Sequence, residues 1–340
     1  MITAFAHARV NLIGEHTDYN SGLALPFAIS EGVTVQGQAL DAPRIETTAV
    51  DLHGHDSFAL TDPPRGRGWR AFVRGAAAEL QRAGVPVSGA RLRITGGVPR
   101  GAGLSSSAAL EVALTLAMVA LSGEPEPDRI ELAKICSRVE NEWVGAQTGL
   151  LDQLSSLLGE ADRALRIDFR SLDIQTVALE LGAHSLVTLD SGDRHSHAGS
   201  GYNDRREECA AAAQALGVPS LREATLETAE RLPEPLNRRA RHVITENERV
   251  DAAVTALERR DMEELGRLLD ASHASLRDDF QISTPAVEAA YGRLHDAGAL
   301  GARIVGGGFG GNVLGLLPPE AEAPDEALEV RPGPGARLLP

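Results

Sequence analysis

The sequence predicts a mixed fold in which strands and helices do not alternate strictly. In the first half, residues of strand and helix character are interleaved, with strand-like runs at 34–38, 91–95 and 165–169 and helix-like stretches at 69–83, 107–121 and 128–144. The second half opens on a strand-like run at 184–190, is mostly helical from 202 to 298, and closes on strand-like runs at 302–305 and 313–316. With 340 residues, the chain is long enough for two domains, and we expect a boundary between 172 and 182.

Composition and charge narrow the class of protein. The chain is 43% hydrophobic and 24% charged, which is typical of a globular protein, and its net charge of −15 argues against nucleic acid or anionic membrane as a partner. Cys136 and Cys209 are too few for a disulfide framework, no apolar run reaches membrane-spanning length, and the start MITAFAHARV lacks a signal-peptide pattern. We therefore expect a cytoplasmic protein.

Residues 99–110, PRGAGLSSSAAL, place two glycines and three serines directly before a long apolar helix. Free N–H groups and the dipole at a helix N-terminus attract anions, and Gly101 and Gly103 let the backbone approach oxygen atoms closely. We interpret this segment as a phosphate cradle; the alternative is a Gly-rich turn before a Ser-capped helix. Lys134 is the only lysine and no G-x-x-x-x-G-K-S/T occurs, which excludes the common NTPase loop and the strand lysine of protein kinases.

A second group of polar residues surrounds the Gly14 turn in residues 9–26, RVNLIGEHTDYNSGLALP. Strand-like runs at 10–13 and 23–29 enter and leave this turn. A polyol offers only hydroxyl groups, and the carboxylates of Glu15 and Asp18 can each accept from two neighbouring hydroxyls. The pattern favours a polyol-binding loop over the alternative, a charged surface turn.

Three motifs in this chain resemble one known family. GEHTDYN, GLSSSAALE and GGGFGG occur in the order of the GHMP small-molecule kinases, and GEHTDYN marks their galactokinase branch. The resemblance covers nearly the whole chain, through WRAFVRG, ENEWVGAQTGLLDQ, IDFRSL, YNDRRE, RARHVITENE and SHASLRDDF. It implies an α+β fold of two GHMP kinase domains, 1–178 and 179–340, with the active site in the cleft between them.

The resemblance also implies an activity and roles for individual residues. The activity is ATP-dependent phosphorylation of the anomeric hydroxyl of galactose, with ATP and Mg²⁺ as cofactors. Asp152 matches the aspartate that faces this hydroxyl as catalytic base, and Arg9 matches the arginine between that aspartate and the transferred phosphoryl group. The implied sugar-binding residues are Glu15, His16, Asp18, Gly149, Asp152 and Tyr202. The implied nucleotide-binding residues are Gly101, Ala102, Gly103, Leu104, Ser105, Ser106, Ser107 and Ala108. Glu140 and Ser107 (or Ser106) match the magnesium ligands, and the loop 306–311 closes over the phosphate site.

Taken without the resemblance, several of these residues have structural alternatives. Asp152 is also typical of a helix N-cap, and Tyr202, expected just before a helix, of a half-buried aromatic. The loop 306–311 also suits a tight hairpin with positive φ angles. The H-x-H pairs His53/His55 and His195/His197 lack a third ligand at metal spacing, so we expect solvated loop histidines.

One departure from the family pattern lies next to Arg9, and other functions stay open. Ala6-His7-Ala8 stands where galactokinases usually read Ala-Pro-Gly, which adds an imidazole near Arg9. A sister kinase acting on an arabinose, a galacturonate or an N-acetylgalactosamine is one alternative, and a non-catalytic sensor of galactose and ATP is another. The intact serines and alanines at 105–109 beside Arg9 and Asp152 favour an enzyme. We expect a monomer, with a dimer as the alternative.

Overall fold

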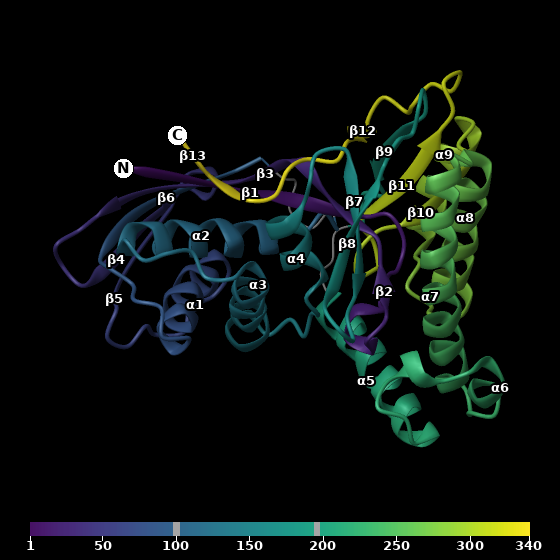
Figure 1. Ribbon diagram of the computed structural model, residues 1–340, viewed down its shortest axis with the longest axis horizontal. Helices are drawn as coiled ribbons and strands as arrows, with labels where there is room; N and C mark the ends of the chain where they lie inside the picture. The colour runs from purple at the N-terminus through teal and green to yellow at the C-terminus, as the bar shows by residue number, and fades with distance from the viewer. Residues whose placement is uncertain (98–102, 194–197) are drawn as a thin grey trace.

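The computed structural model describes residues 1–97, 103–193 and 198–340 and has two lobes lying side by side (Figure 1). The strands are β1 (Ile2–Asn11), β2 (Leu23–Ala24), β3 (Pro26–Ala39), β4 (Arg44–Ala49), β5 (Gly54–Ala59), β6 (Ala90–Gly96), β7 (Arg163–Asp168), β8 (Asp173–Ala178), β9 (Ser185–Asp190), β10 (Gly301–Ile304), β11 (Asn312–Leu317), β12 (Leu328–Val330) and β13 (Arg337–Leu339). The helices are α1 (Trp69–Arg82), α2 (Ser106–Ser122), α3 (Arg129–Arg138), α4 (Leu151–Leu158), α5 (Ala198–Leu216), α6 (Leu226–Ala229), α7 (Leu236–Arg259), α8 (Met262–Asp278) and α9 (Pro285–Asp296).

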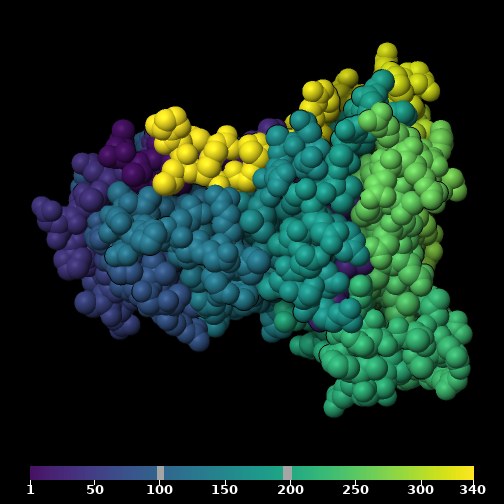
Figure 2. Space-filling model, viewed as in Figure 1, coloured from purple at the N-terminus to yellow at the C-terminus, as the bar shows by residue number. Residues whose placement is uncertain are grey.

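The first lobe is a large sheet covered on one face by α1 to α4 (Figure 1). Its strand order is β13-β1-β3-β6-β4-β5, so the C-terminal strand pairs with the N-terminal one. Helix α2 is buried along most of its length because its residues are largely alanine, leucine and valine, and it packs against β1 and β3. The C-terminal segment lies across the top of this lobe (Figure 2).

The second lobe packs α8 and α9 against a sheet of order β10-β11-β9-β12, and α7 packs against α8 and contacts β2 and β8. A third sheet, β2-β7-β8, lies between this lobe and the large sheet (Figure 1). One hydrophobic cluster contains residues of both halves of the chain, including Leu12 and Leu25 from the first half and Val250 and Leu316 from the second. The two lobes therefore share a core, which fixes the Gly14 turn relative to α7 and β11.

Most predicted elements are present, and two differ in detail. The stretch 128–144 is not one α-helix: α3 ends at Arg138 and a π-helical turn, Val139–Val144, continues to Gly145, whose φ is 89°. The strand predicted at 23–29 is split, because β2 pairs with β7 whereas β3 begins at Pro26 and pairs with β1. The domain boundary at 178/179 falls at the end of β8 and stays a prediction.

The histidine pairs are only partly as expected. His53 is exposed in a turn, but His55 lies on β5 and not in a loop, where its Nδ1 is 3.0 Å from Thr48 Oγ1. His195 and His197 lie outside the described residues.

Candidate active site

A cavity of about 340 Å³ lies where the two lobes meet. It is lined by Arg9, Glu15, His16, Asp18, Gly103, Leu104, Ser105, Ser106, Ser107, Glu140, Ala146, Thr148, Gly149, Leu151, Asp152, Tyr202, Asn203, Gly306, Gly307 and Gly308. The cavity therefore brings together the predicted phosphate cradle, the Gly14 turn and the loop 306–311. Of the predicted site residues that the structure describes, only Ala108 does not line it, because its side chain is buried in α2. Gly101 and Ala102 lie outside the described residues.

Arg9 and Asp152 form the ion pair at the centre of this cavity. Arg9 Nε donates to Asp152 Oδ1 at 2.7 Å, and Arg9 NH1 donates to the carbonyl of Gly103 at 2.6 Å. The Arg9 side chain is 6% exposed and that of Asp152 is 20% exposed. Although burial lowers the pKa of Arg9, the charges of Asp152 and Glu15 raise it above its ordinary range, so the guanidinium stays charged.

The structure contradicts the alternative for Asp152 and agrees only in part with the one for the serines. Asp152 is not an N-cap, because it lies in the first turn of α4 and Leu150 occupies the N-cap position. Ser105 occupies the N-cap position of α2 with φ 60°, but its side chain makes no cap hydrogen bond. Instead, the Ser105 hydroxyl donates to Asp152 Oδ2. The Asp152 carboxylate is thus held on one oxygen by Arg9 and on the other by Ser105.

The residues of the Gly14 turn are buried, so the alternative of a charged surface turn is wrong. Glu15 and His16 are each 4% exposed. Glu15 Oε1 accepts from the backbone N–H of Gly306 at 2.8 Å and is 3.2 Å from Arg303 NH2, which joins the turn to the loop after β10. This loop is also a tight hairpin between antiparallel β10 and β11, with positive φ at Gly306, Gly308 and Phe309.

Aromatic rings and one carboxylate form the wall next to His16. The Tyr19 hydroxyl is 2.7 Å from His16 Nδ1, and the ring of Tyr202 lies 5.1 Å from the His16 ring. Burial, with the charge of His242, lowers the pKa of His16 to about 3, so the imidazole is neutral. Its Nε2 atom is buried and has no hydrogen-bond partner within the described part of the chain. Tyr202 lies within α5 and not before a helix as predicted.

Asp18 is the carboxylate of this wall. Burial, together with the nearby charge of Asp152, raises the pKa of Asp18 to about 6. Gly149 lies directly against it, since a Cβ at Gly149 would collide with the Asp18 carboxylate. Only glycine lets the loop before α4 approach so closely.

Glu140 and Ser107 lie together at the end of the cavity nearest α2. The Ser107 hydroxyl bonds to the Glu140 carboxylate, whose Oε2 also accepts from Thr148 Oγ1 at 2.8 Å and from Gln153 Nε2 at 2.9 Å. Burial and the charge of Asp152 raise the pKa of Glu140. Burial and the charge of Glu140 raise the pKa of Glu111, which lies behind it, well above the usual range. A positive ion beside Glu140 would relieve this excess of buried negative charge.

A second cavity, of about 460 Å³, adjoins the first at Ser106 and Ser107. Its lining is mostly apolar and includes Val33, Trp69, Phe72, Ile94 and Leu110. Sequence reasoning did not assign these residues to a site. The spacing of Trp69 and Phe72, three residues apart on α1, was the available signal, but it fits a core-facing helix equally well.

Other lining residues were also missed. Asn203 lines the first cavity, and its Oδ1 is buried without a hydrogen-bond partner among the described residues. Thr148 lines it too. Nothing local in the sequence distinguishes Asn203 from an ordinary helix residue; its position one residue after Tyr202 was the only signal.

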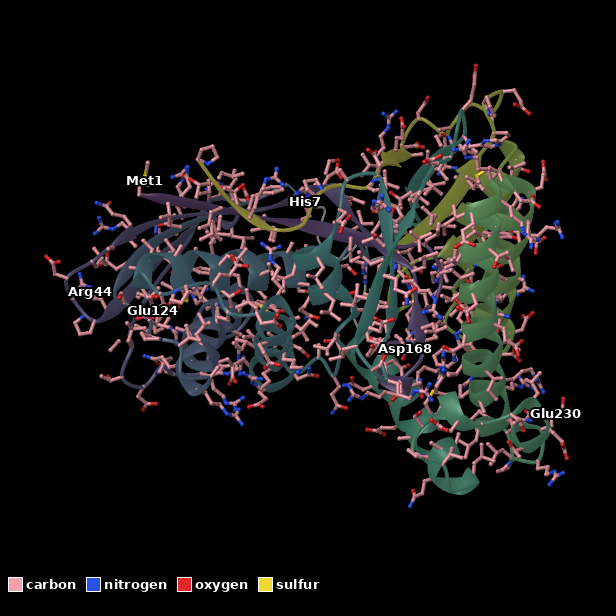
Figure 3. The ribbon with its side chains drawn as sticks, viewed as in Figure 1. Met1, His7, Arg44, Glu124, Asp168 and Glu230 are labelled. Carbon is pink, nitrogen blue, oxygen red and sulfur yellow. The ribbon has the colours of Figure 1, made fainter. Side chains whose placement is uncertain are left out.

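The imidazole of His7 does not lie near the cavity, contrary to the expectation from sequence. His7 is on β1 near the C-terminal segment (Figure 3), where its Nδ1 donates to the carbonyl of Ile29 at 2.6 Å. Nε2 then accepts from Arg337 NH1 at 3.1 Å on β13. A register shift between His7 and Arg9 separates the two side chains in the sheet.

Comparison with known families gives three matches along the chain. Residues 71–160 match the GHMP kinases N terminal domain, residues 253–332 match the GHMP kinases C terminal domain, and residues 2–39 match the galactokinase galactose-binding signature. The cavity residues come from all three regions or lie between them. Fold and site together thus define a GHMP small-molecule kinase of α+β architecture with two domains, as expected.

Two relatives show to which family within the GHMP kinases the chain belongs. The chain is 44% identical over 333 residues to the galactokinase of Mycobacterium tuberculosis (strain ATCC 25618 / H37Rv), covering 96% of this chain and 91% of the relative. It is 42% identical over 328 residues to the galactokinase of Roseiflexus sp. (strain RS-1), covering 92% and 82%. The chain belongs to the galactokinase family.

Solved structures agree in fold. The crystal structure of Lactococcus lactis galactokinase complexed with galactose matches with a TM-score of 0.93 at 29% identity, over 99% of this chain and 94% of that one. The Methanococcus jannaschii mevalonate kinase matches with a TM-score of 0.70 at 19% identity, over 98% of each chain, and shares the fold. No helix in the described residues is long and apolar enough to cross a membrane.

Proposed function

We propose that this protein transfers the γ-phosphoryl group of ATP to the anomeric hydroxyl of galactose, giving galactose 1-phosphate and ADP. The observation that carries the proposal is the position of Asp152. It lies between the cavity wall of Asp18, His16 and Tyr202 and the N-terminus of α2, held on both oxygens by Arg9 and Ser105. Membership of the galactokinase family supports both ATP and galactose as substrates.

In this proposal the two cavities divide the substrates between them. The apolar second cavity, with Trp69 and Phe72, takes the adenine base, and the first cavity takes galactose. The triphosphate then runs past Ser106 and Ser107, which line both cavities. These serines begin α2, so its N-terminal N–H groups meet the phosphate oxygens. The resulting path brings the γ-phosphate towards Arg9 and Asp152.

Galactose is recognised by polar groups that lie around Asp152. Asp18 and Glu15 supply acceptor oxygens, and Asn203 Oδ1 is free to accept a hydroxyl proton. His16 Nε2 bonds to a hydroxyl as donor or acceptor according to the tautomer of its ring. Tyr202 covers a face of the sugar, and the backbone at Gly149 borders it. A sugar that lacks one of these hydroxyls leaves a buried polar atom without a partner, which costs about 1–3 kcal/mol.

Proton transfer is assigned to Asp152 and charge stabilisation to Arg9. The Asp152 carboxylate accepts the proton of the anomeric hydroxyl as its oxygen attacks the γ-phosphorus, and the bond to the β–γ bridging oxygen of ADP breaks. Arg9 holds the carboxylate in place and neutralises negative charge on the phosphoryl oxygens. Arg9 NH1 is already oriented by the Gly103 carbonyl, so little reorganisation is required.

We further propose that Glu140 and Ser107 hold Mg²⁺. The two side chains are hydrogen-bonded to each other and offer hard oxygen ligands, and the raised pKa of Glu140 reflects negative charge that a cation would offset. The described residues contain no group of three or more His, Cys, Asp or Glu side chains arranged to bind a metal, so Glu140 and Ser107 would be the side chains that hold the ion. The ion supplies charge neutralisation for the β- and γ-phosphates.

The test is ADP release by the purified protein with ATP, Mg²⁺ and a sugar panel of galactose, glucose, arabinose, galacturonate and N-acetylgalactosamine. We expect turnover with galactose above all others and its loss in Asp152→Asn. Preferred turnover of another sugar would replace galactose as substrate. A galactose-dependent thermal shift without turnover on any sugar would contradict the enzyme and indicate a sensor.

Localisation and assembly complete the proposal. Cys136 and Cys209 are free and buried, which agrees with a reducing cytoplasm. We propose a monomer, which light scattering coupled to size-exclusion chromatography would test.

A further inference from the structure

Arg206 lies outside the cavity, next to its sugar end, and connects the two halves of the chain there. It lies on α5, one turn after Tyr202, and does not line the cavity itself. Its NH1 donates to the carbonyl of Gln147 and is 3.5 Å from the carbonyl of Thr148. Its guanidinium carbon also lies 5.7 Å from the centroid of the Tyr19 ring. One side chain of the second half therefore contacts two separate segments of the first half.

Each segment that Arg206 contacts contributes residues to the wall of the cavity at its sugar end. Tyr19 bonds to His16 Nδ1 and so orients its unpartnered Nε2. Thr148 precedes Gly149, which lies against the Asp18 carboxylate. On its own helix, Arg206 is four residues after Tyr202, whose ring faces His16. These three walls come from distant parts of the sequence, and Arg206 connects them.

The neighbouring Arg205 shows that this arrangement is specific to Arg206. Arg205 Nε donates to the carbonyl of Phe280 at 2.7 Å, and its NH1 donates to Glu208 Oε2 at 2.8 Å. Arg205 therefore holds α5 to its own half of the chain. Arg206, in contrast, forms no ion pair among the residues that the structure describes, although its charge acts on Asp18 and opposes the rise in the pKa of that carboxyl. A guanidinium paired only with carbonyls and a ring is suited to fixing geometry.

We propose that Arg206 is a positioning residue for the sugar, a clasp that holds the segment 146–149 and Tyr19 against α5. The proposal rests on galactose being the substrate. Because Arg206 touches neither the α2 N-terminus nor the second cavity, the clasp serves sugar binding and not nucleotide binding. Phosphoryl transfer within the assembled complex depends on Arg9 and Asp152, which Arg206 does not contact.

The test compares Arg206→Met and Arg206→Lys with wild type. Methionine keeps the length and removes the charge and donors, whereas lysine keeps the charge and one point of donation. Arg231→Met is the matched control, because Arg231 is exposed and, within the part of the chain that the structure describes, forms an ion pair only with Glu227 of α6. The galactose Kd is measured by calorimetry without nucleotide, and KM for each substrate and kcat by ADP release.

We expect Arg206→Met to raise the galactose Kd and KM about 10- to 100-fold, as for loss of a charge-assisted hydrogen bond and a cation–π contact. We expect kcat and the KM for ATP to stay within about threefold, Arg206→Lys to recover part of the affinity, and Arg231→Met to match wild type.

A galactose Kd within twofold of wild type in Arg206→Met would overturn the clasp. So would an equal rise in both KM values, or no recovery in Arg206→Lys. Failure of wild type to phosphorylate galactose would instead contradict the proposed function, and the Kd comparison separates the two results.

Discussion

The two ends of the active-site cavity are built from different groups: side chains at one end and mostly backbone at the other. At the sugar end the wall consists of side chains: the buried His16 ring, the half-buried Tyr202 ring and the half-buried Asp18 side chain. At the phosphate end it consists largely of backbone in the left-handed region, with φ of 74° at Gly103, 60° at Ser105 and 82° at Gly306. Arg9 and Asp152 lie where the two ends meet.

Because of this difference, specificity for the sugar and binding of the phosphate anion depend on different groups of the protein. Side chains at fixed positions distinguish one arrangement of hydroxyls from another, because each mismatch leaves a buried group without a partner. Backbone N–H groups at a helix N-terminus bind phosphate oxygens whatever is attached to them. Arg9 is the only lysine or arginine among the residues that line the described cavity. In a chain of net charge −15, the proposed mechanism places this cation at the point of phosphoryl transfer.

The largest expected effect is at the junction of the two ends. Asp152→Asn keeps the size of the side chain and one acceptor for Arg9 but removes the group that we propose takes the proton. We expect kcat to fall about 10²- to 10⁴-fold, as for loss of a general base. Single-turnover measurement of galactose 1-phosphate would give the rate of the chemical step. Because both ends remain intact, the Kd values for galactose and ATP should stay within a few-fold, and a variant with more than a tenth of wild-type kcat would contradict the assignment.

A change at one end only should affect one substrate only. In Gly149→Ala the new methyl group would collide with Asp18, which must move. We expect the KM for galactose to rise at least about tenfold, since 1.4 kcal/mol of lost binding already gives that factor, and the KM for ATP to stay unchanged. Steady-state kinetics with each substrate varied in turn would measure both.

Gly292→Ala is the control for this substitution, because Gly292 lies on α9 with no atom near the position of the added methyl. It should leave both KM values at the wild-type level. Equal changes in the two KM values of Gly149→Ala would show that the ends of the cavity are not independent.

Local patterns were sufficient to predict much of the fold. Helix α2 was predicted to within a residue because its apolar periodicity and the preceding Gly-Ser segment both lie within about twenty residues. The end of α3 was not, because the π-helical turn at Val139–Val144 depends on how Glu140 and Trp143 pack against other elements. The pairing of β13 with β1 was also missed, because a three-residue strand carries almost no periodic signal.

The same limit applies to the site. Arg9, Glu15 and Asp152 were predicted because they lie in motifs with an interpretable chemistry, and all three line the cavity. Asn203 and Arg206 were not assigned, because their roles depend on contacts between segments that are far apart in the sequence, such as Arg206 with Gln147. The second cavity was not assigned either, because its lining is assembled from several separate segments of the first lobe. His7 was placed near Arg9 by adjacency in the sequence, but alternation and a register shift in β1 direct it to the C-terminal strand.

The smallest expected effect concerns the buried charge of Asp18. Its pKa is raised to about 6 in the folded protein by burial and by Asp152, against 3.8 when unfolded. The folded state therefore binds a proton more tightly, so this group stabilises the protein below pH about 4 and that contribution is lost as pH rises through about 6. About two units correspond to about 3 kcal/mol at pH 8, where the carboxylate is charged in both states. Asp18→Asn should therefore raise Tm by a few degrees at pH 8 while it weakens galactose binding, whereas Asp204→Asn, an exposed change on α5, should do neither.

In wild type, the affinity for galactose should fall as pH drops below about 6, because a protonated Asp18 loses acceptor capacity. Calorimetry between pH 5 and 8 would measure this fall, and in Asp152→Asn it should shift to lower pH, since the charge that raises the pKa of Asp18 is gone. An Asp18→Asn variant with lower Tm at pH 8 would show that the sugar end tolerates this buried charge without cost.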